Sequence, residues 1–183
     1  MKKIRILRRN LIVSIRTIMI FPEFEGMEII DEIREKYDPL AHLVRPHITI
    51  VYPFENKMSN DDMADIFLDR LKNIHPFELV LNGISNQEDR FGNYLFLDIK
   101  EGNAEICNIH NVLYDNEFYE YDLGLGYKPH MTVGKLPTVE ALDAAYENVK
   151  EINRVFKTVV NKIYVEMIDE SEESIIILEH ELC

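Results

Sequence analysis

Arg45-Pro46-His47-Ile48-Thr49-Ile50 is matched, 83 residues later, by Lys128-Pro129-His130-Met131-Thr132-Val133. Each stretch has a basic residue, a proline, and then histidine and threonine in alternation with apolar residues. This alternation is typical of a β-strand, in which every second side chain points to the same face. The pattern therefore predicts two strands, each of which presents one imidazole and one hydroxyl on a single face.

The duplication of this motif is more informative than either copy alone. With six histidines and five threonines in the chain, only about 0.16 His-x-Thr triplets are expected by chance, so two copies that both follow proline are a specific signal. If the two strands lie face to face, two imidazoles and two hydroxyls meet in one cleft, an arrangement suited to acid–base chemistry on a phosphate. The simpler alternative is two strands that each carry a half-buried histidine and a threonine, a residue that favours strands.

Composition limits the partners that such a site can have. The chain has 183 residues and a net charge of −13, whereas proteins that bind long nucleic acids normally present a basic surface. We therefore expect a small or short phosphate-bearing substrate, no long duplex and no membrane. The apolar run near the N-terminus is interrupted by Arg16, too early for a signal peptide, which favours a cytoplasmic location. The two cysteines form neither a disulfide framework nor a zinc pattern, and we expect no metal site.

The order of expected elements repeats along the chain. The first half predicts strands at 15–21, 47–52 and 77–81 and helices at 27–37 and 59–71, with a turn at Asn82-Gly83. The second half predicts strands at 94–99, 130–133 and 159–167 and helices at 103–113 and 138–149, followed by an acidic turn at 169–173 and an extra strand at 174–181. Two β-α-β-α-β units indicate an α+β fold with internal duplication. A doubly wound sheet is less favoured, because no Gly-rich phosphate loop follows a strand.

We accordingly expect a single bilobal domain over residues 1–183, with one lobe at 11–85 and the other at 90–168. Each lobe would contribute an antiparallel sheet flanked by helices, and a cleft would lie between the two lobes. The chain is expected to be a monomer.

The paired motifs resemble those of the 2H phosphoesterase superfamily, in particular its bacterial 2′-5′ RNA ligase-like (LigT-like) branch. The stretch from Lys36-Tyr37-Asp38-Pro39 through His47 to Phe54 is also similar to that branch, and the resemblance extends from about residue 15 to residue 182. It implies a bilobal α+β fold with two antiparallel sheets beside a cleft. It also implies action, without metal or cofactor, on 2′,3′-cyclic phosphates, 2′-5′ linkages or related diesters. By this resemblance His47 and His130 are the catalytic pair.

The resemblance further implies that Thr49 and Thr132 hold the phosphate oxygens, and several neighbours are candidates for cleft contacts. Arg45 and Lys128 either point into the cleft or are solvated where the chain bends at the prolines. Strand parity places Gly134 on the face of Thr132, where it would leave room for a ligand, and places Tyr52 behind the sheet. Tyr127, together with Tyr119 and Tyr121, either stacks on a base or packs at the rim.

Three functions fit these observations. The first is a metal-independent phosphodiesterase that acts on a nucleotide or a short RNA end with a cyclic or 2′-linked phosphate. The second is an RNA-joining enzyme that uses the same groups in reverse to form a 2′-5′ bond. The third is a nucleotide-binding module without turnover. The acidic charge favours the first over the second, and the presence of both histidines and both threonines favours catalysis over the third.

Overall fold

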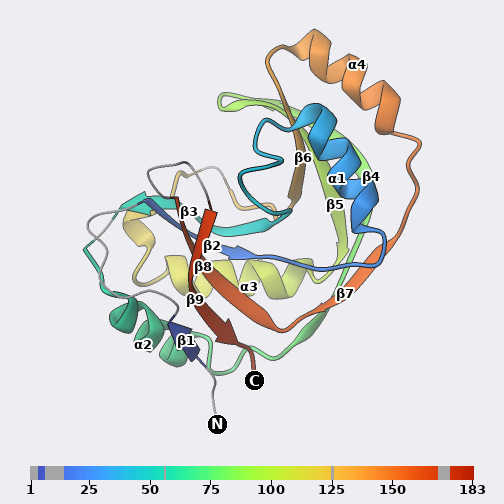
Figure 1. Ribbon diagram of the computed structural model, residues 1–183. Coiled ribbons are helices and arrows are strands. Elements are labelled where there is room, and N and C mark those ends of the chain that lie inside the picture. The colour runs from blue at the N-terminus through green and yellow to red at the C-terminus, as the bar shows by residue number, and fades with distance from the viewer. Residues whose placement is uncertain (1–3, 7–14, 56, 125, 169–173) are drawn as a thin grey trace.

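The described strands of the protein form a single antiparallel sheet. The computed structural model describes residues 4–6, 15–55, 57–124, 126–168 and 174–183. Within these ranges nine strands pair in the order β1-β9-β8-β2-β3-β6-β5-β4-β7. Their bounds are β1 Ile4–Ile6, β2 Ile15–Ile20, β3 Ile48–Glu55, β4 Phe77–Asp89, β5 Gly92–Glu101, β6 Met131–Leu136, β7 Phe156–Val160, β8 Lys162–Ile168 and β9 Ser174–Glu181. The sheet curls strongly, as Figure 1 shows, and the α+β fold class is as expected.

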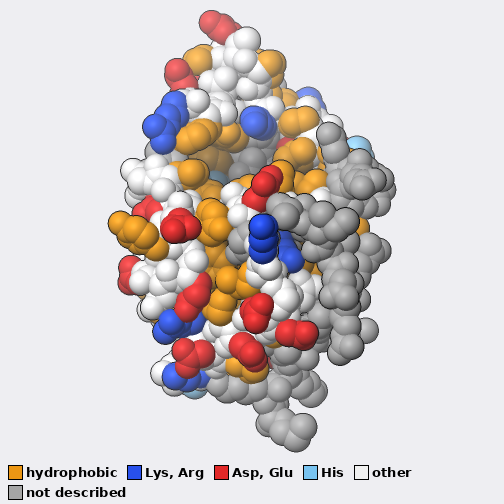
Figure 2. Space-filling model, turned by 90° about the vertical axis from the view of Figure 1, so that its left-hand side faces the viewer, with side chains coloured by type: hydrophobic (Ala, Val, Ile, Leu, Met, Phe, Trp, Pro, Cys, Tyr) orange, Lys and Arg blue, Asp and Glu red, His pale blue; other side chains and the backbone are white. Residues whose placement is uncertain are grey.

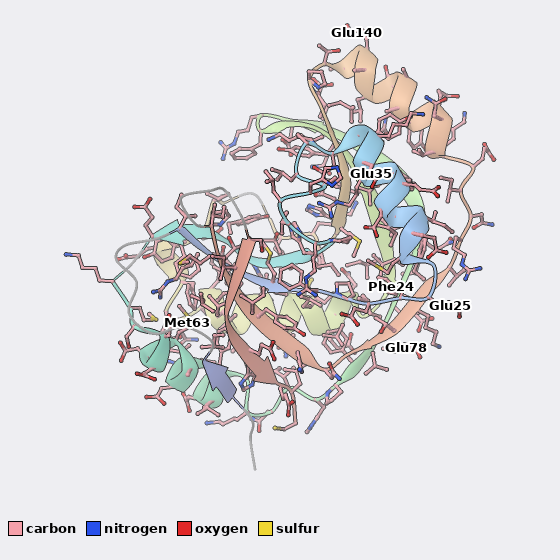
Figure 3. The ribbon with its side chains drawn as sticks, viewed as in Figure 1. Phe24, Glu25, Glu35, Met63, Glu78 and Glu140 are labelled. Atoms are coloured by element: carbon pink, nitrogen blue, oxygen red, sulfur yellow. The ribbon has the colours of Figure 1, made fainter. Side chains whose placement is uncertain are left out.

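Helices cover the two halves of the sheet in a crossed arrangement. Their bounds are α1 Met27–Tyr37, α2 Asn60–Arg70, α3 Asn103–Tyr114 and α4 Val139–Val149, with a short 3-10 helix at Tyr119–Tyr121. Helices α1 and α4 contact β6 and its neighbours, whereas α2 contacts β1 and β9, and α3 packs mainly on β3. Figure 3 shows this separation through Phe24, just before α1, and Met63 on α2. Each half of the sheet is therefore covered by one helix from each half of the chain.

Local sequence signals explain where the helices begin. Ser59 caps α2: its hydroxyl accepts from the backbone N–H of Asp62, and the Asp62 carboxylate accepts from the backbone N–H of Ser59, which is a capping box. Thr138 caps α4 through a single bond, in which its hydroxyl accepts from the backbone N–H of Ala141. These starts, and the span of α1, agree with the sequence prediction.

The strands differ from the prediction in three places. β3 continues through Pro53 to Glu55, where a register shift against β2 accommodates the proline. β4 passes through Asn82-Gly83 without turning, because a second register shift absorbs these residues. The strand expected at 159–167 is two strands separated by Asn161, and they pair with different partners. The acidic turn expected at 169–173 lies outside the described residues.

The two halves of the sheet are not the two halves of the sequence. β4 was expected in the first lobe but pairs with β5 and β7, and β8 was expected in the second lobe but pairs with β2. The lobes expected at 11–85 and 90–168 therefore exchange strands. The halves also join into one sheet rather than standing as two, so the motif strands β3 and β6 are hydrogen-bonded neighbours and do not lie face to face as expected. Among the described residues, no helix is long and apolar enough to cross a membrane.

Candidate active site

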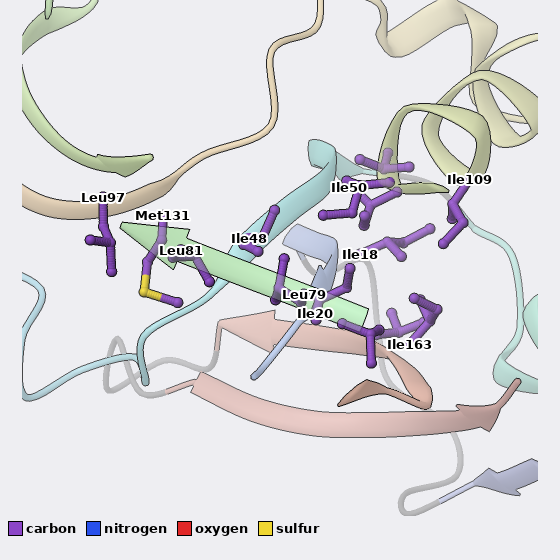
Figure 4. Close-up of a cluster of buried hydrophobic side chains, with 14 of the residues drawn as sticks. Ile18, Ile20, Ile48, Ile50, Leu79, Leu81, Leu97, Ile109, Met131 and Ile163 are labelled. Atoms are coloured by element: carbon purple, nitrogen blue, oxygen red, sulfur yellow. The ribbon is translucent and has the colours of Figure 1, made fainter. Parts of the chain in front are cut away.

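The junction between the two halves of the sheet brings the repeated motifs together. In the described part of the chain, β3 and β6 pair through Ile48 and Met131 alone. Both side chains are fully buried in the core, where Figure 4 shows them near Leu81 and Leu97. Because residues that face each other across an antiparallel pair share a face of the sheet, the residues that flank this pair lie on the opposite face.

The flanking residues are the histidines and threonines of the motifs. Continued by one residue in each direction, the antiparallel register sets His47 opposite Thr132 and Thr49 opposite His130. All four side chains are half-buried, in contrast to the apolar residues between them. The structure thus brings these four predicted residues to one face, about an approximate two-fold axis through the central pair.

Each histidine ring is oriented by the same local hydrogen bond. Nδ1 of His47 lies 2.8 Å from the carbonyl oxygen of Arg45, and Nδ1 of His130 lies 2.8 Å from that of Lys128. A carbonyl oxygen only accepts, so Nδ1 carries the proton in both rings. Nε2 is consequently the nitrogen left to accept or donate a proton. In each motif a buried proline, Pro46 or Pro129, lies between the residue that supplies the carbonyl group and the histidine. Its fixed φ angle holds the backbone in the conformation that this hydrogen bond requires.

Burial lowers the pKa of both imidazoles below the ordinary histidine value. The hydrogen bonds to the two backbone carbonyls oppose this effect, because they favour the protonated ring. For His47, the positive charge of Arg34 lowers the pKa further, whereas the negative charge of Asp38, its ion-pair partner, raises it. The charge of His130 also lowers the pKa of His47. A negatively charged ligand between the rings would act in the opposite direction and favour a proton on one of them.

A β-bulge follows the threonine in each motif strand. Against β2, the register shifts between the pairs Met19–Thr49 and Ile18–Val51, and against β5 it shifts between Phe96–Thr132 and Leu95–Gly134. In both strands one extra residue is inserted at the same distance from the histidine. A bulge reverses the side-chain alternation beyond it.

This reversal overturns two expectations based on strand parity. Gly134 does not face the cleft: a Cβ there would lie 3.1 Å from both Leu95 Cδ1 and Tyr37 Cβ, so the position packs against β5 and α1. Tyr52 does not pack behind the sheet, because it lines a pocket beside His130. A signal was present in the sequence, since Ile50-Val51 and Val133-Gly134 both break the polar–apolar alternation.

Tyr127 packs against the first motif strand and does not line the pocket beside His130. Its hydroxyl donates to the carbonyl oxygen of Thr49 at 2.7 Å, and its ring stacks on His110 of α3 with centroids 3.7 Å apart. His110 Nδ1 lies 2.8 Å from the Ile50 carbonyl oxygen. These side chains bind backbone groups of β3 just beyond its single pair with β6. Of the two roles expected for Tyr127, the structure shows packing, and a contact with a ligand stays a prediction.

The two basic residues before the histidines occupy different surroundings. Lys128 lines the pocket that contains His130 and Thr132. Arg45 lies over the ring of Phe21 at 4.5 Å and has an ion-pair contact of 3.8 Å with Glu23, and it lines a separate pocket beside α1. Only Lys128 is thus placed in the pocket with its own motif histidine.

The pocket beside His130 has a volume of about 560 Å³. Its residues come from β3, β4, β5, β6 and the loop before β6: Tyr52, Pro53, Gln87, Asp89, Phe91, Tyr94, Phe96, Leu123, Gly126, Lys128, His130 and Thr132. The face on this side of the molecule is hollowed, and hydrophobic side chains form much of the rim (Figure 2). Most of these residues were not predicted, since nothing in the sequence indicates that β4 and β5 flank the second motif.

Among the described residues, no group of three or more His, Cys, Asp or Glu side chains is arranged to hold a metal ion. The chemistry available at the junction is instead that of two imidazoles, two hydroxyls and one nearby ammonium group.

Comparison with known proteins shows which family the chain belongs to. The family model described as the 2′-5′ RNA ligase superfamily matches residues 22–171. A Bacillus mycoides protein named "Putative phosphoesterase" is 27% identical over 122 residues, which cover 64% of this chain and 67% of that protein. A Bacillus licheniformis protein of the same designation is 26% identical over 145 residues, covering 72% and 83% of the two chains.

Solved structures show the same fold. Escherichia coli LigT in complex with 3′-AMP has a TM-score of 0.60 at 13% identity, with 93% of this chain and 99% of that chain covered. A Thermus thermophilus protein has a TM-score of 0.61 at 11% identity, with 92% and 97% covered. The family model, the two relatives and the shared fold together identify a LigT-like 2H phosphoesterase. The chain belongs to the 2′-5′ RNA ligase superfamily.

Proposed function

We propose that the protein is a metal-independent phosphodiesterase that opens a 2′,3′-cyclic phosphate, or cleaves a 2′-5′ linkage, in a nucleotide or short RNA end. The observation that carries this proposal is the register at the Ile48–Met131 pair, which sets two His-x-Thr motifs opposite each other on one face. The LigT structures are described as complexes with 3′-AMP, NADP⁺ and ATP, which supports a nucleotide as the ligand.

The geometry supplies each group that the reaction needs. One imidazole accepts a proton from water at Nε2 as the water oxygen bonds to phosphorus. The other donates its Nε2 proton to the ribose oxygen as the phosphorus–oxygen bond breaks. The hydroxyls of Thr49 and Thr132 donate to the non-bridging oxygens, where negative charge increases in the transition state. Because burial lowers the pKa of both rings in the free protein, binding of the phosphate anion provides the charge that keeps one ring protonated.

The net charge of the protein favours a small substrate. The net charge of −13 opposes the approach of a long polyanion, whereas a single phosphate next to Lys128 is favoured locally. Reversal of the same proton transfers would form a 2′-5′ bond, so an RNA-joining assay with short oligonucleotides is a necessary companion to the hydrolysis assay.

The decisive experiment is hydrolysis of the four 2′,3′-cyclic mononucleotides and of 2′-5′ dinucleotides in the presence of EDTA. We expect turnover by the wild-type protein and its loss in His47→Ala and His130→Ala. His42→Ala is a matched control, because this histidine is exposed and lies outside both motifs. Activity that EDTA abolishes, or that survives in both motif variants, would contradict the proposal. Nucleotide binding without turnover would indicate a binding module.

A further inference from the structure

The pocket beside His130 has aromatic walls that continue outward from the catalytic imidazole. Phe96 stacks on His130 with ring centroids 3.8 Å apart, and Tyr94 stacks on Phe96 at 5.6 Å. Phe91, at the tip of the β4–β5 hairpin, is 46% exposed, and Tyr52 lines the same pocket. Phe96 itself is buried, so the rings that a ligand can reach are those of Phe91, which is exposed, and of Tyr94 and Tyr52, which are half-buried. Accessible aromatic rings stack on unpaired nucleobases. A base attached to a phosphate at the junction therefore has a surface on which to lie.

The hairpin tip that closes this pocket is held by its own hydrogen bonds. The Tyr94 hydroxyl donates to the Phe91 carbonyl oxygen at 2.9 Å, and the Phe91 backbone N–H donates to Oδ1 of Asp89 at 2.8 Å. Gln87 Nε2 donates to Oδ2 of the same carboxylate at 3.1 Å. These bonds orient Asp89 before any ligand binds, which is the condition for selective recognition.

Asp89 is the one carboxylate among the described residues that line the pocket, and Lys128 is the one ammonium group. Each oxygen of Asp89 accepts one of the bonds above and keeps a second lone pair. The carboxylate lies within electrostatic reach of the site, since its charge opposes the effect of burial on the pKa of His130. The pocket therefore offers a cation for the phosphate and a pair of acceptors for the base.

Two acceptors side by side match one nucleobase best. The pairing edge of guanine presents two adjacent donors, the N1–H and the 2-amino group. Adenine and cytosine present one amino donor beside a ring acceptor, which a carboxylate oxygen would repel, and uracil presents one N–H between two carbonyl groups. Bidentate bonding to a carboxylate is also stronger than a single neutral bond.

We infer that this pocket recognises guanine through Asp89, so that the preferred substrate of the proposed phosphodiesterase is a guanine nucleotide. The inference rests on the proposed function for the position of the phosphate and adds the identity of the base. A site built to bond polar groups of its ligand rejects analogues that lack them, so selectivity is expected in kcat/KM.

The test compares the four 2′,3′-cyclic mononucleotides with the full-length wild-type protein and Asp89→Asn. For the wild type we expect kcat/KM for the guanosine substrate to exceed the other values by about ten-fold or more. Asn at position 89 replaces one acceptor by a donor and keeps the shape. It should reduce the guanosine value by about ten-fold and raise the adenosine or cytidine value relative to it.

Glu88→Gln is the matched control, because it removes a neighbouring charge on β4 at a position outside the pocket. It should leave the order of the four substrates unchanged. Equal kcat/KM for all four bases, or an equal loss for all four in Asp89→Asn, would overturn the inference while leaving the phosphodiesterase proposal intact.

Calorimetric binding of the four nucleoside 3′-monophosphates makes the test independent of catalysis. Tighter binding of 3′-GMP by wild type, weakened in Asp89→Asn, supports guanine recognition even if no substrate is turned over. Binding without preference, or no binding of any of the four, contradicts it.

Discussion

The two motif strands, β3 and β6, agree in their chemistry and differ in their surroundings. Both place an exposed basic residue, a buried proline and a half-buried histidine in the same order. Both close the same Nδ1–carbonyl hydrogen bond and continue into a bulge at the same point. His130, however, stacks on the face of Phe96, whereas the ring of His47 contacts Phe21 edge-on, with ring centroids 6.1 Å apart. The symmetric features are those that would serve the proposed proton transfer, and the asymmetric features are those that would select a substrate.

The largest expected effect comes from removing either imidazole. His47→Ala and His130→Ala should each lower kcat by about 10²- to 10⁴-fold, the usual contribution of a general acid or base. Because the two rings act as one unit, the double variant should lose little more than either single variant. Steady-state kinetics on a cyclic nucleotide measure this directly. A variant that kept near-wild-type kcat would show that its half of the site does not take part.

The threonines should have a smaller and equal effect. Thr49→Val and Thr132→Val keep the shape and the strand preference of the side chain but remove the hydroxyl donor, so each should lower kcat by about 10²-fold. Equal losses would place the phosphate on the approximate two-fold axis between the strands. A loss confined to Thr132→Val would place it in the half that contains the pocket, and unchanged kcat in both variants would contradict a role in binding the phosphate oxygens.

The sequence determined the symmetric part of this site because that part depends on local pattern. Alternation identified both motif strands, and Ser59 and Thr138 marked the starts of two helices correctly. Parity failed beyond the motifs, since a bulge adds one residue to β3 and to β6 and thereby moves Gly134 and Tyr52 to the opposite faces. Ile50 and Val51 are consecutive apolar residues in an otherwise alternating strand, and this break indicates the first bulge. A prediction that assigns every second residue to the same face does not take the break into account.

The asymmetric part could not be derived from local pattern. It depends on which strands flank each motif, and the exchange of β4 and β8 between the halves of the sheet is decided by long-range pairing. Asp89 and Phe96 lie far from both motifs in the sequence and join the site only through β4 and β5. Tyr127 is a similar case, because its position in a loop gave no indication of its partner on β3.

Tyr127 allows a sharper comparison of the two strands. It lies three residues before His130 and binds the carbonyl oxygen of Thr49, whereas the corresponding residue before His47 is Val44. Tyr127→Phe removes this bond and keeps the ring that stacks on His110. We expect it to lower kcat by about ten-fold with little change in KM, because the hydroxyl of Tyr127 holds the backbone of the first motif strand in place.

Tyr121→Phe is a matched control for this change. Its hydroxyl donates to the carbonyl oxygen of Glu55 at 3.1 Å, at the far end of the same strand, so the chemical loss is the same and only its location differs. Tyr121→Phe should keep wild-type kcat. If both variants lower thermal stability equally and neither changes kcat, Tyr127 has a structural role alone.

The smallest expected effect is on stability, and it tests the burial that the two motifs share. Burial lowers the pKa of His47, His130 and His110 in the folded protein, whereas in the unfolded chain each histidine titrates near about 6.5. As the pH falls through that value, the unfolded chain takes up protons that the folded protein excludes, so the free energy of unfolding must decrease.

Urea unfolding between pH 8 and pH 5 should show this decrease. His47→Ala and His130→Ala should each reduce the slope of the free energy of unfolding against pH, whereas His42→Ala serves as the exposed control. Because carboxylates act equally in all these variants, the difference in slope isolates the imidazoles. Equal slopes in the wild type and both motif variants would mean that the rings are freely solvated, and the shared burial of the two motifs would then be refuted.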